Sequence, residues 1–253
     1  MNALTQVWVF CFALCSVVLV TGFKFAGRLG LLVSFFVCIG LLYLLIHKGL
    51  ELYLKHLKAE EKKGSDPTGF KSTLYQLASV YRFNKVTLYY ASEPTHPLVW
   101  QSLNTDLNII IHPELVNDID QNEKKMLAHL MLSHGREHCR LRRRFLSILY
   151  LAFAPLSQYL SGLFNLVAHL CGLKKQIFKA DLEAFRNLGL ASFESKNNFS
   201  LFLRKLHHLS FHKTSYKKGE SFFSILSTAN NPYLKLNLSP NLHHRMSNLS
   251  GDY

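Results

Sequence analysis

A stretch near the middle of the chain, Met126-Leu127-Ala128-His129-Leu130-Met131-Leu132-Ser133-His134, predicts the central helix of the fold. Apolar residues recur along it at the spacing of helical turns, so that one face collects Met126, Leu127, Leu130, Met131 and His134. This helix is expected to run from Asn122 to about Arg144. Its end is strongly basic, and positive side chains are favourable at the C-terminus of a helix.

The residues before this helix predict one further helix and two strands. One face of the helix is marked by Phe70, Leu74, Leu77, Ala78 and Tyr81. The runs Val86–Tyr90 and Asn108–Ile111 predict strands, and Glu93–Pro97 between them predicts a turn. Upstream, the composition Gly-Ser-Asp-Pro-Thr-Gly of residues 64–69 is typical of a linker.

A hydrophobic segment without charged residues, 145–173, follows the central helix. It is interrupted by Pro155, Ser157, Gln158 and Gly162. A single membrane span here would carry the next segment across the bilayer, whereas a broken pair in the interface or packed on the domain would not. A helix around Lys179–Leu190 comes next, and the tail Ser192–Tyr253 is polar and basic with short apolar patches.

Two apolar runs at the N-terminus, Val7–Phe23 and Leu29–Ile46, predict a transmembrane helical hairpin. Each run is near the lower limit of about 17–25 residues for a spanning helix. The link Lys24–Arg28 is so short that two spans must fold back on each other. A signal peptide is the rival interpretation of the first run, but that run lacks a basic start and a clear cleavage site. The predicted organisation is a hairpin in 1–48, a basic linker in 49–69 and a domain in 70–253.

The formal net charge of the 253-residue chain is +13. Lys24 and Arg28 favour placing the hairpin loop in the cytoplasm. A longer basic set after the second run favours placing the domain there, and it prevails by number: His47, Lys48, Lys55, Lys58, Lys62 and Lys63. Membrane lipids are therefore the expected partners. No nucleic-acid motif accompanies the positive charge, so nucleic acid is not an expected partner.

The five cysteines are Cys11, Cys15, Cys38, Cys139 and Cys171. Three lie in the apolar runs, and the other two do not show the short spacing of a cysteine metal site. This usage suits a reducing compartment.

The order of these parts is similar to that of M48 peptidases of the HtpX type. Those proteins carry a hydrophobic hairpin, a helix–strand lead-in, an HExxH helix, a hydrophobic insert, a helix with E-x-x-A-D and a late H-P…R motif. The resemblance implies a mainly helical α+β fold: the hairpin, then a zincin-like peptidase domain with its hydrophobic insert in 145–173. It also implies a bacterial cytoplasmic membrane.

Three local matches carry the resemblance. Residues 126–134 look like the family's L-A-H-E-L-S-H stretch, with Leu130 at the first His, Met131 at the Glu and His134 at the second His. Residues 177–181, Ile-Phe-Lys-Ala-Asp, resemble E-x-x-A-D, with Ile177 at the third zinc ligand. Ser239-Pro240 with the later residues 245–249 is similar to the family's H-P…R-I…L close.

The substitutions at these positions predict the loss of the family's chemistry. In HExxH, two His bind zinc from one helix face and the Glu takes a proton from the zinc-bound water. Leu130 and Ile177 cannot bind zinc, and Met131 cannot move a proton. His134 alone retains a ligand position. The resemblance therefore implies a catalytically inactive pseudopeptidase with a binding or regulatory role, without a cofactor.

Two shifted sites define an alternative. His129 lies one residue from the position of the first ligand, a rotation of about 100° on a helix. His134-Gly135-Arg136-Glu137-His138 spells the inverted zinc motif HxxEH. If His129, Glu137 or His138 rescued a zinc site, the protein would be an active, divergent zinc endopeptidase in membrane protein quality control. In both cases a membrane protein or an unfolded polypeptide is the expected partner. A third interpretation is a basic membrane-surface protein outside the family.

Overall fold

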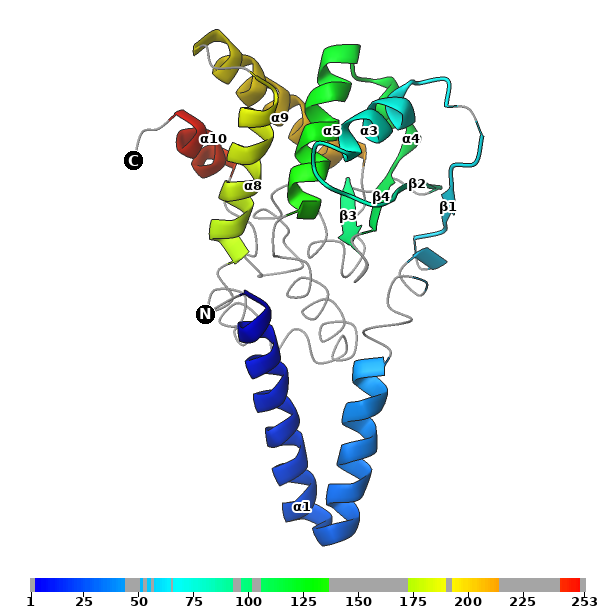
Figure 1. Ribbon diagram of the computed structural model, residues 1–253, viewed down its shortest axis with the longest axis vertical. Coiled ribbons are helices and arrows are strands. Elements are labelled where there is room, and N and C mark those ends of the chain that lie inside the picture. The colour runs from blue at the N-terminus through cyan, green and yellow to red at the C-terminus, as the bar shows by residue number, and fades with distance from the viewer. Residues whose placement is uncertain are drawn as a thin grey trace. The chain divides into compact units, whose positions relative to one another are not determined.

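A computed structural model describes residues 3–43, 51, 54–55, 57–64, 66–92, 97–101, 106–136, 173–189, 193–213 and 242–250. The chain divides into two compact units, Met1–Tyr53 and Leu54–Tyr253. Helices predominate and one sheet is present, so the predicted mainly helical α+β class is confirmed (Figure 1). The predicted insert 145–173 lies outside the described residues except for its last residue, Leu173. The end of the predicted central helix after Arg136 and turn residues 93–96 also lie outside them.

The first unit contains one kinked helical element, α1, from Ala3 to Tyr43. Its helical path is broken at Ala26 (φ −137°) and Gly27 (φ 58°), in the predicted loop. Gly27 has the left-handed backbone that glycine adopts most readily. A Cβ on Gly30 would overlap the carbonyl oxygen of Gly22, so the two arms approach at their glycines. Figure 1 shows the two arms leaving this turn and spreading apart toward their far ends.

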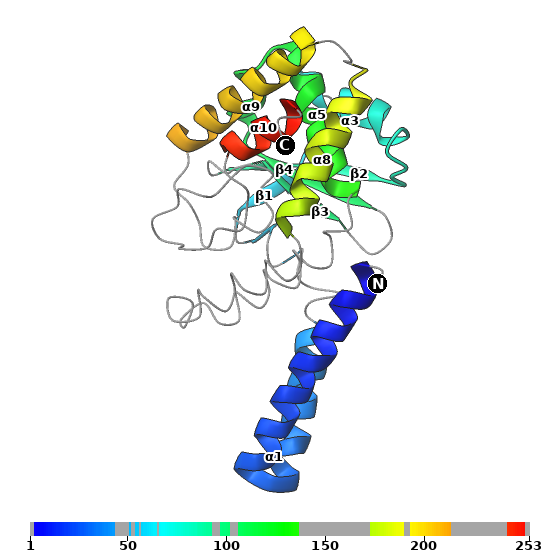
Figure 2. The same cartoon turned by 90° about the vertical axis from the view of Figure 1, so that its left-hand side faces the viewer.

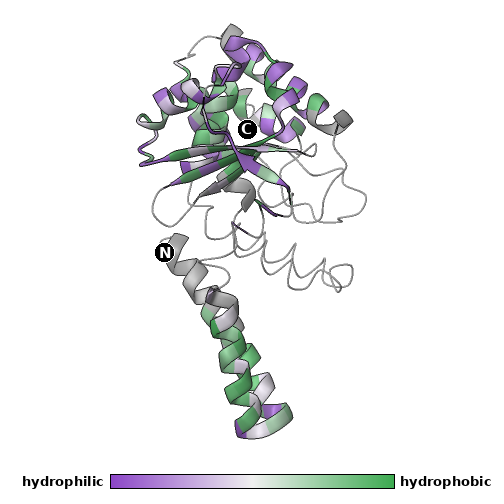
Figure 3. Cartoon of the chain, turned by 90° about the vertical axis from the view of Figure 1, so that its right-hand side faces the viewer, coloured by the Kyte–Doolittle hydropathy of each residue, from purple (hydrophilic) through white to green (hydrophobic). Residues whose placement is uncertain are grey.

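Apolar side chains cover the outside of α1. The stretch Cys15–Gly40, which includes the kink, is long and apolar enough to cross a membrane. Most of the exposed large hydrophobic side chains of the described residues lie on α1. In the described part of the second unit, the exposed ones are Tyr75, Val80 and Leu201. In Figure 3, which colours the backbone by residue hydropathy, much of α1 has the colour of hydrophobic residues. Soluble domains rarely expose contiguous apolar surface of this extent, so the exposure supports membrane association.

The second unit contains a four-stranded sheet with the strand order β1-β2-β4-β3. Strand β2 (Val86–Ala91) runs parallel to β4 (Leu107–Ile111), and both confirm the predicted strands. The edge strands β1 (Ala59–Glu61) and β3 (Leu98–Gln101) pair antiparallel with β2 and β4. Neither edge strand was expected from the sequence.

The segment expected to be a linker is partly folded onto the domain. It contributes β1, whose backbone pairs with β2. It also contributes Asp66, whose carboxylate accepts a hydrogen bond from the backbone N–H of Lys71 at 2.9 Å, in the first turn of the next helix. Burial alone would raise the pKa of Asp66, but this and other hydrogen bonds lower it. The composition of residues 64–69 therefore marks a helix start as well as a turn.

The helices of the described part pack on the sheet and on each other (Figure 2). They are α3 (Phe70–Ala78), α4 (Pro113–Asn117), α5 (Gln121–Arg136), α8 (Leu173–Asn187), α9 (Phe193–Lys213) and α10 (Leu242–Ser250). The predicted face of α3 is confirmed, because Phe70, Leu74 and Ala78 are buried. Helix α8 starts before the predicted Lys179. Helices α9 and α10 occupy the tail, in which no helix was predicted.

The C-terminal end of α5 lies directly on strand β4. A Cβ on Gly135 would collide with Leu107 Cδ1 and would lie 2.9 Å from Leu107 Cδ2 and 3.2 Å from Phe83 Cζ. Position 135 therefore accepts no side chain without displacing the core.

We expect Gly135→Val to lower the free energy of unfolding by about 1–3 kcal/mol, because overpacking forces core side chains out of place. Urea unfolding of the full chain in detergent measures the change. Lys125→Val, at an exposed position of the same helix, controls for the helix propensity of valine and should cost about 0.5 kcal/mol. Equal costs for the two variants would show that position 135 is not crowded.

Candidate functional site

The positions expected to match the peptidase site lie on α5 and α8, which pack against each other. Leu130 and Met131 on α5 are 0 % exposed, and Ile177 on α8 is 3 % exposed. Leu130 and Met131 belong to the main hydrophobic core. These side chains offer no lone pair to a metal ion and no group that exchanges a proton.

His134 is the one candidate on this face with a chemically active side chain, and it is buried. Its Nε2 lies 3.0 Å from Oδ1 of Asp181, a fully buried carboxylate on α8. Because an ionised carboxylate only accepts hydrogen bonds, the imidazole donates through Nε2. The Nε2 nitrogen is thus used to hold α5 to α8.

Arg245 on α10 completes the cluster from a third helix. Its Nε donates to Asp181 Oδ2 at 2.7 Å, and its Nη2 donates to Oδ1 at 2.6 Å. The arginine side chain is 1 % exposed. This two-pronged pairing of guanidinium and carboxylate is the strong geometry for a buried charge pair. We call the three side chains His134, Asp181 and Arg245 the buried cluster.

Electrostatics in the buried cluster favour the ionised carboxylate. Burial raises the pKa of Asp181, but the charge of Arg245 and the hydrogen bond from His134 outweigh it and hold the pKa below its ordinary value. Burying an arginine is costly unless it is paired, and here the pairing satisfies it. The cluster therefore acts as a structural joint between α5, α8 and α10.

His129, the shifted candidate, has a different partner. Its Nδ1 lies 2.9 Å from the hydroxyl oxygen of Tyr81. Burial lowers the pKa of His129, so the neutral imidazole is favoured at neutral pH. Burial also raises the pKa of Tyr81 to about 12. The hydrogen-bond partner of His129 is thus Tyr81, whereas that of His134 Nε2 is Asp181. The other two alternative residues, Glu137 and His138, lie outside the described residues.

The donor set in this region does not fit zinc. Within the described ranges, no three His, Cys, Asp or Glu side chains are grouped so as to hold a metal ion. A catalytic zinc needs three protein ligands and an open position. In the buried cluster, the His134 imidazole and the Asp181 carboxylate bond to each other, and the Arg245 guanidinium repels a cation.

Asp181 and Arg245 were not among the residues singled out as site candidates, although both fall in the stretches that carry the family resemblance. The sequence contained one signal for Asp181. It lies one helical turn after Ile177 and next to Ala180, so it falls on the apolar side of its helix. Arg245 gave no comparable signal, because arginines in a basic tail are usually exposed.

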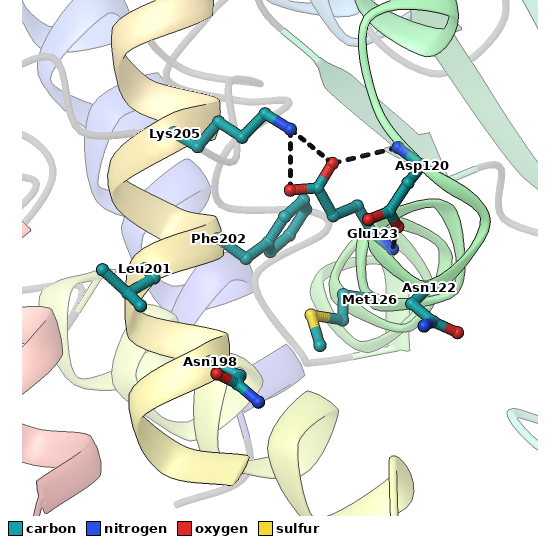
Figure 4. Close-up of a pocket in the computed structure, with 8 residues that line it drawn as sticks. All are labelled: Asp120, Asn122, Glu123, Met126, Asn198, Leu201, Phe202 and Lys205. Atoms are coloured by element: carbon teal, nitrogen blue, oxygen red, sulfur yellow. Dashed lines mark hydrogen bonds and ion pairs between the residues drawn. The ribbon is translucent and has the colours of Figure 1, made fainter. Parts of the chain in front are cut away.

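A separate pocket of about 500 Å³ lies between α9 and the N-terminal end of α5. Figure 4 shows Glu123 at its edge, bound to Lys205 at 2.6 and 2.8 Å and to the backbone N–H of Asp120 at 3.0 Å. Met126, Leu201 and Phe202 add apolar lining. Glu123 and Asp120 cap the start of α5 by reciprocal hydrogen bonds. The polar groups here are thus explained by helix capping and one ion pair.

Comparison with protein-family models, with curated proteins and with solved structures found no match to this chain.

We expect Asp181→Asn to lower the free energy of unfolding by about 3–5 kcal/mol, because it leaves the buried Arg245 without its counter-charge. Adding Arg245→Met to the same chain should recover part of that loss, since no uncompensated charge then remains. Denaturant unfolding of the single and double variants measures the difference.

Glu183→Gln, on the same helix, is the matched control. It breaks the ion pair with Arg136, whose side chain is 42 % exposed, and should cost less than about 1 kcal/mol. If Asp181→Asn costs no more than this control, or if the double variant is worse than the single one, the buried cluster is not a structural joint.

The contribution of Asp181 should depend on pH in one direction. Its pKa is lower in the folded chain than the ordinary value of 3.8. The stabilisation is therefore complete above about pH 4–5 and is lost as the pH falls through the folded pKa. The difference in free energy of unfolding between wild type and Asp181→Asn should be largest at neutral pH and should shrink below pH 4. A difference that is constant from pH 7 to pH 3 would contradict this assignment.

Proposed function

We propose that this protein is a membrane-anchored pseudopeptidase similar to the M48 peptidases of the HtpX type. It keeps the paired helices of the peptidase and has lost the zinc site. It acts by binding a membrane protein or an unfolded polypeptide, with its domain on the cytoplasmic side of the membrane. The observation that carries the proposal is the buried cluster.

The cluster supports the alignment because it joins the three stretches that resemble the family. His134 comes from the HExxH-like helix, Asp181 from the E-x-x-A-D-like helix and Arg245 from the late arginine stretch. These residues are 47 and 64 positions apart in sequence. The contact between these three distant stretches is an observation separate from their sequence similarity, and it supports this order of parts.

The buried apolar residues support the loss of activity. Leu130 and Met131 are fully buried, and Ile177 is nearly so. Each apolar side chain of this size contributes about 1.5–3 kcal/mol when it is fully buried. Restoring polar ligands at these positions would forfeit that stabilisation unless a metal ion offset it. Packing has thus replaced coordination as the means of holding α5 against α8.

The positive charge of the chain supports a binding role beside the membrane. The membrane anchor and the positive charge place a basic domain beside a lipid surface, where membrane proteins and emerging polypeptides are found. Such a domain can hold a polypeptide without cleaving it. The expected ligand is therefore proteinaceous.

The test restores the zinc site. Leu130→His, Met131→Glu and Ile177→Glu in one chain should give a protein that binds about one zinc ion per molecule, because these residues rebuild the two His and one Glu ligands. Wild type should carry no stoichiometric zinc and show no chelator-sensitive cleavage of an unfolded model protein. Elemental analysis after purification in detergent measures the metal, and thermal unfolding with and without zinc reports folding.

Two controls decide the interpretation. Adding His134→Ala to the restored chain should abolish zinc binding, and moving the new histidine to position 132 in place of 130 should do so as well. If the restored chain folds but binds no zinc, the alignment is wrong. If wild type binds zinc and cleaves the model protein, the protein is an active peptidase.

A further inference from the structure

Two free cysteines occupy matching positions on the arms of α1. Cys15 lies 11 residues before Ala26, and Cys38 lies 11 residues after Gly27. An α-helix rises 1.5 Å per residue, so both thiols are about 16 Å from the turn. In a hairpin with antiparallel arms, residues at equal distances from the turn lie opposite each other.

Burial shows that the two thiols lie on the inner side of the hairpin. Cys38 is 7 % exposed, whereas its neighbours Val37 and Ile39 are 49 % and 47 % exposed. Cys15 is half-buried. Cys15 is the neighbouring group that acts electrostatically on Cys38. The two side chains are therefore neighbours on the inner side of the hairpin.

The arms approach each other closely at small residues near the turn. A Cβ on Gly22 would overlap the Ser34 hydroxyl and lie 2.6 Å from the carbonyl oxygen of Gly30. Small residues allow helix backbones to come this near. A disulfide needs Cα atoms about 4.4–6.8 Å apart, so the link requires the arms to come equally close at Cys15 and Cys38.

We propose that Cys15 and Cys38 form an oxidation site that a lipid-soluble hydroperoxide converts to a disulfide across the hairpin. One thiol sulfur attacks the outer peroxide oxygen, the O–O bond breaks, and the alcohol leaves with the thiol proton. The resulting sulfenic acid is attacked by the second thiol, which releases water and forms the S–S bond. Two thiols and one hydroperoxide thus give one disulfide, one alcohol and one water.

The choice of oxidant follows from depth and rests on the proposed membrane insertion. A position about 16 Å from the turn is near the middle of a hydrocarbon core about 30 Å thick. Water-soluble oxidants enter this apolar region only at low concentration. A hydroperoxide that dissolves in lipid reaches the thiols at higher local concentration.

The experiment uses the full chain in lipid vesicles treated with cumene hydroperoxide. Remaining thiols are then blocked, the protein is denatured and trypsin cleaves after Lys24 and Arg28, which separates the arms. We expect the peptides bearing Cys15 and Cys38 to stay joined until a reducing agent is added, as measured by mass spectrometry. Hydrogen peroxide at the same concentration should give the link at least tenfold more slowly.

Matched variants test the pairing. Cys15→Ser and Cys38→Ser should each abolish the link, whereas Cys11→Ser, one turn away on the same arm, should retain it. A link from Cys11 to Cys38, a link between two chains, or oxidation without any link would overturn the proposal. Equal rates with the two peroxides would overturn the lipid-phase step. The zinc test of the proposed function is independent of both results.

Discussion

A guanidinium group and a carboxylate can leave water together only if each satisfies the other, because an unpaired charge in the interior costs several kcal/mol. Arg245 and Asp181 meet this condition through two hydrogen bonds of 2.6 and 2.7 Å, and His134 supplies a further donor to the same carboxylate. The three residues lie on α10, α8 and α5. The position of the last described helix therefore depends on one carboxylate, and the docking of α8 on α5 shares that dependence.

The same contacts limit the chemistry that this region can perform. A peptidase of the resembled type directs its second histidine at a metal ion, with two other ligands and a base beside it. Here the Nε2 of His134 donates to Asp181, and the neighbouring positions carry hydrocarbon within the core. The positions that the sequence suggested as a site therefore contribute to core packing and offer few lone pairs to a metal ion.

The sequence predicted those elements in which apolar residues recur at a regular spacing and become buried. Helices α3 and α5 and strands β2 and β4 are of this kind. The two arms of α1 were predicted instead from the length of their apolar runs. It did not predict β1, because Ala59-Glu60-Glu61 becomes a strand only by backbone pairing with the edge of β2. Strand β3 has only four residues, too few to show the alternation of buried and exposed side chains that is typical of a strand. In the tail, Phe199, Leu203 and Leu206 have helical spacing, but their polar neighbours masked it. The burial of Arg245 could not be predicted locally, since it depends on a carboxylate 64 residues earlier.

His134 is the residue on which the competing interpretations differ most. A histidine at a position that resembles a metal-ligand position invites the inference that it takes part in metal chemistry. In this chain, however, His134 has a role that needs no metal, because it donates to a carboxylate that already neutralises a buried arginine. Removing the imidazole would leave the buried Asp181 carboxylate with one donor fewer. Structural constraint alone is therefore sufficient to account for His134, whereas an active site would also require donors at positions 130 and 177, where leucine and isoleucine lie buried.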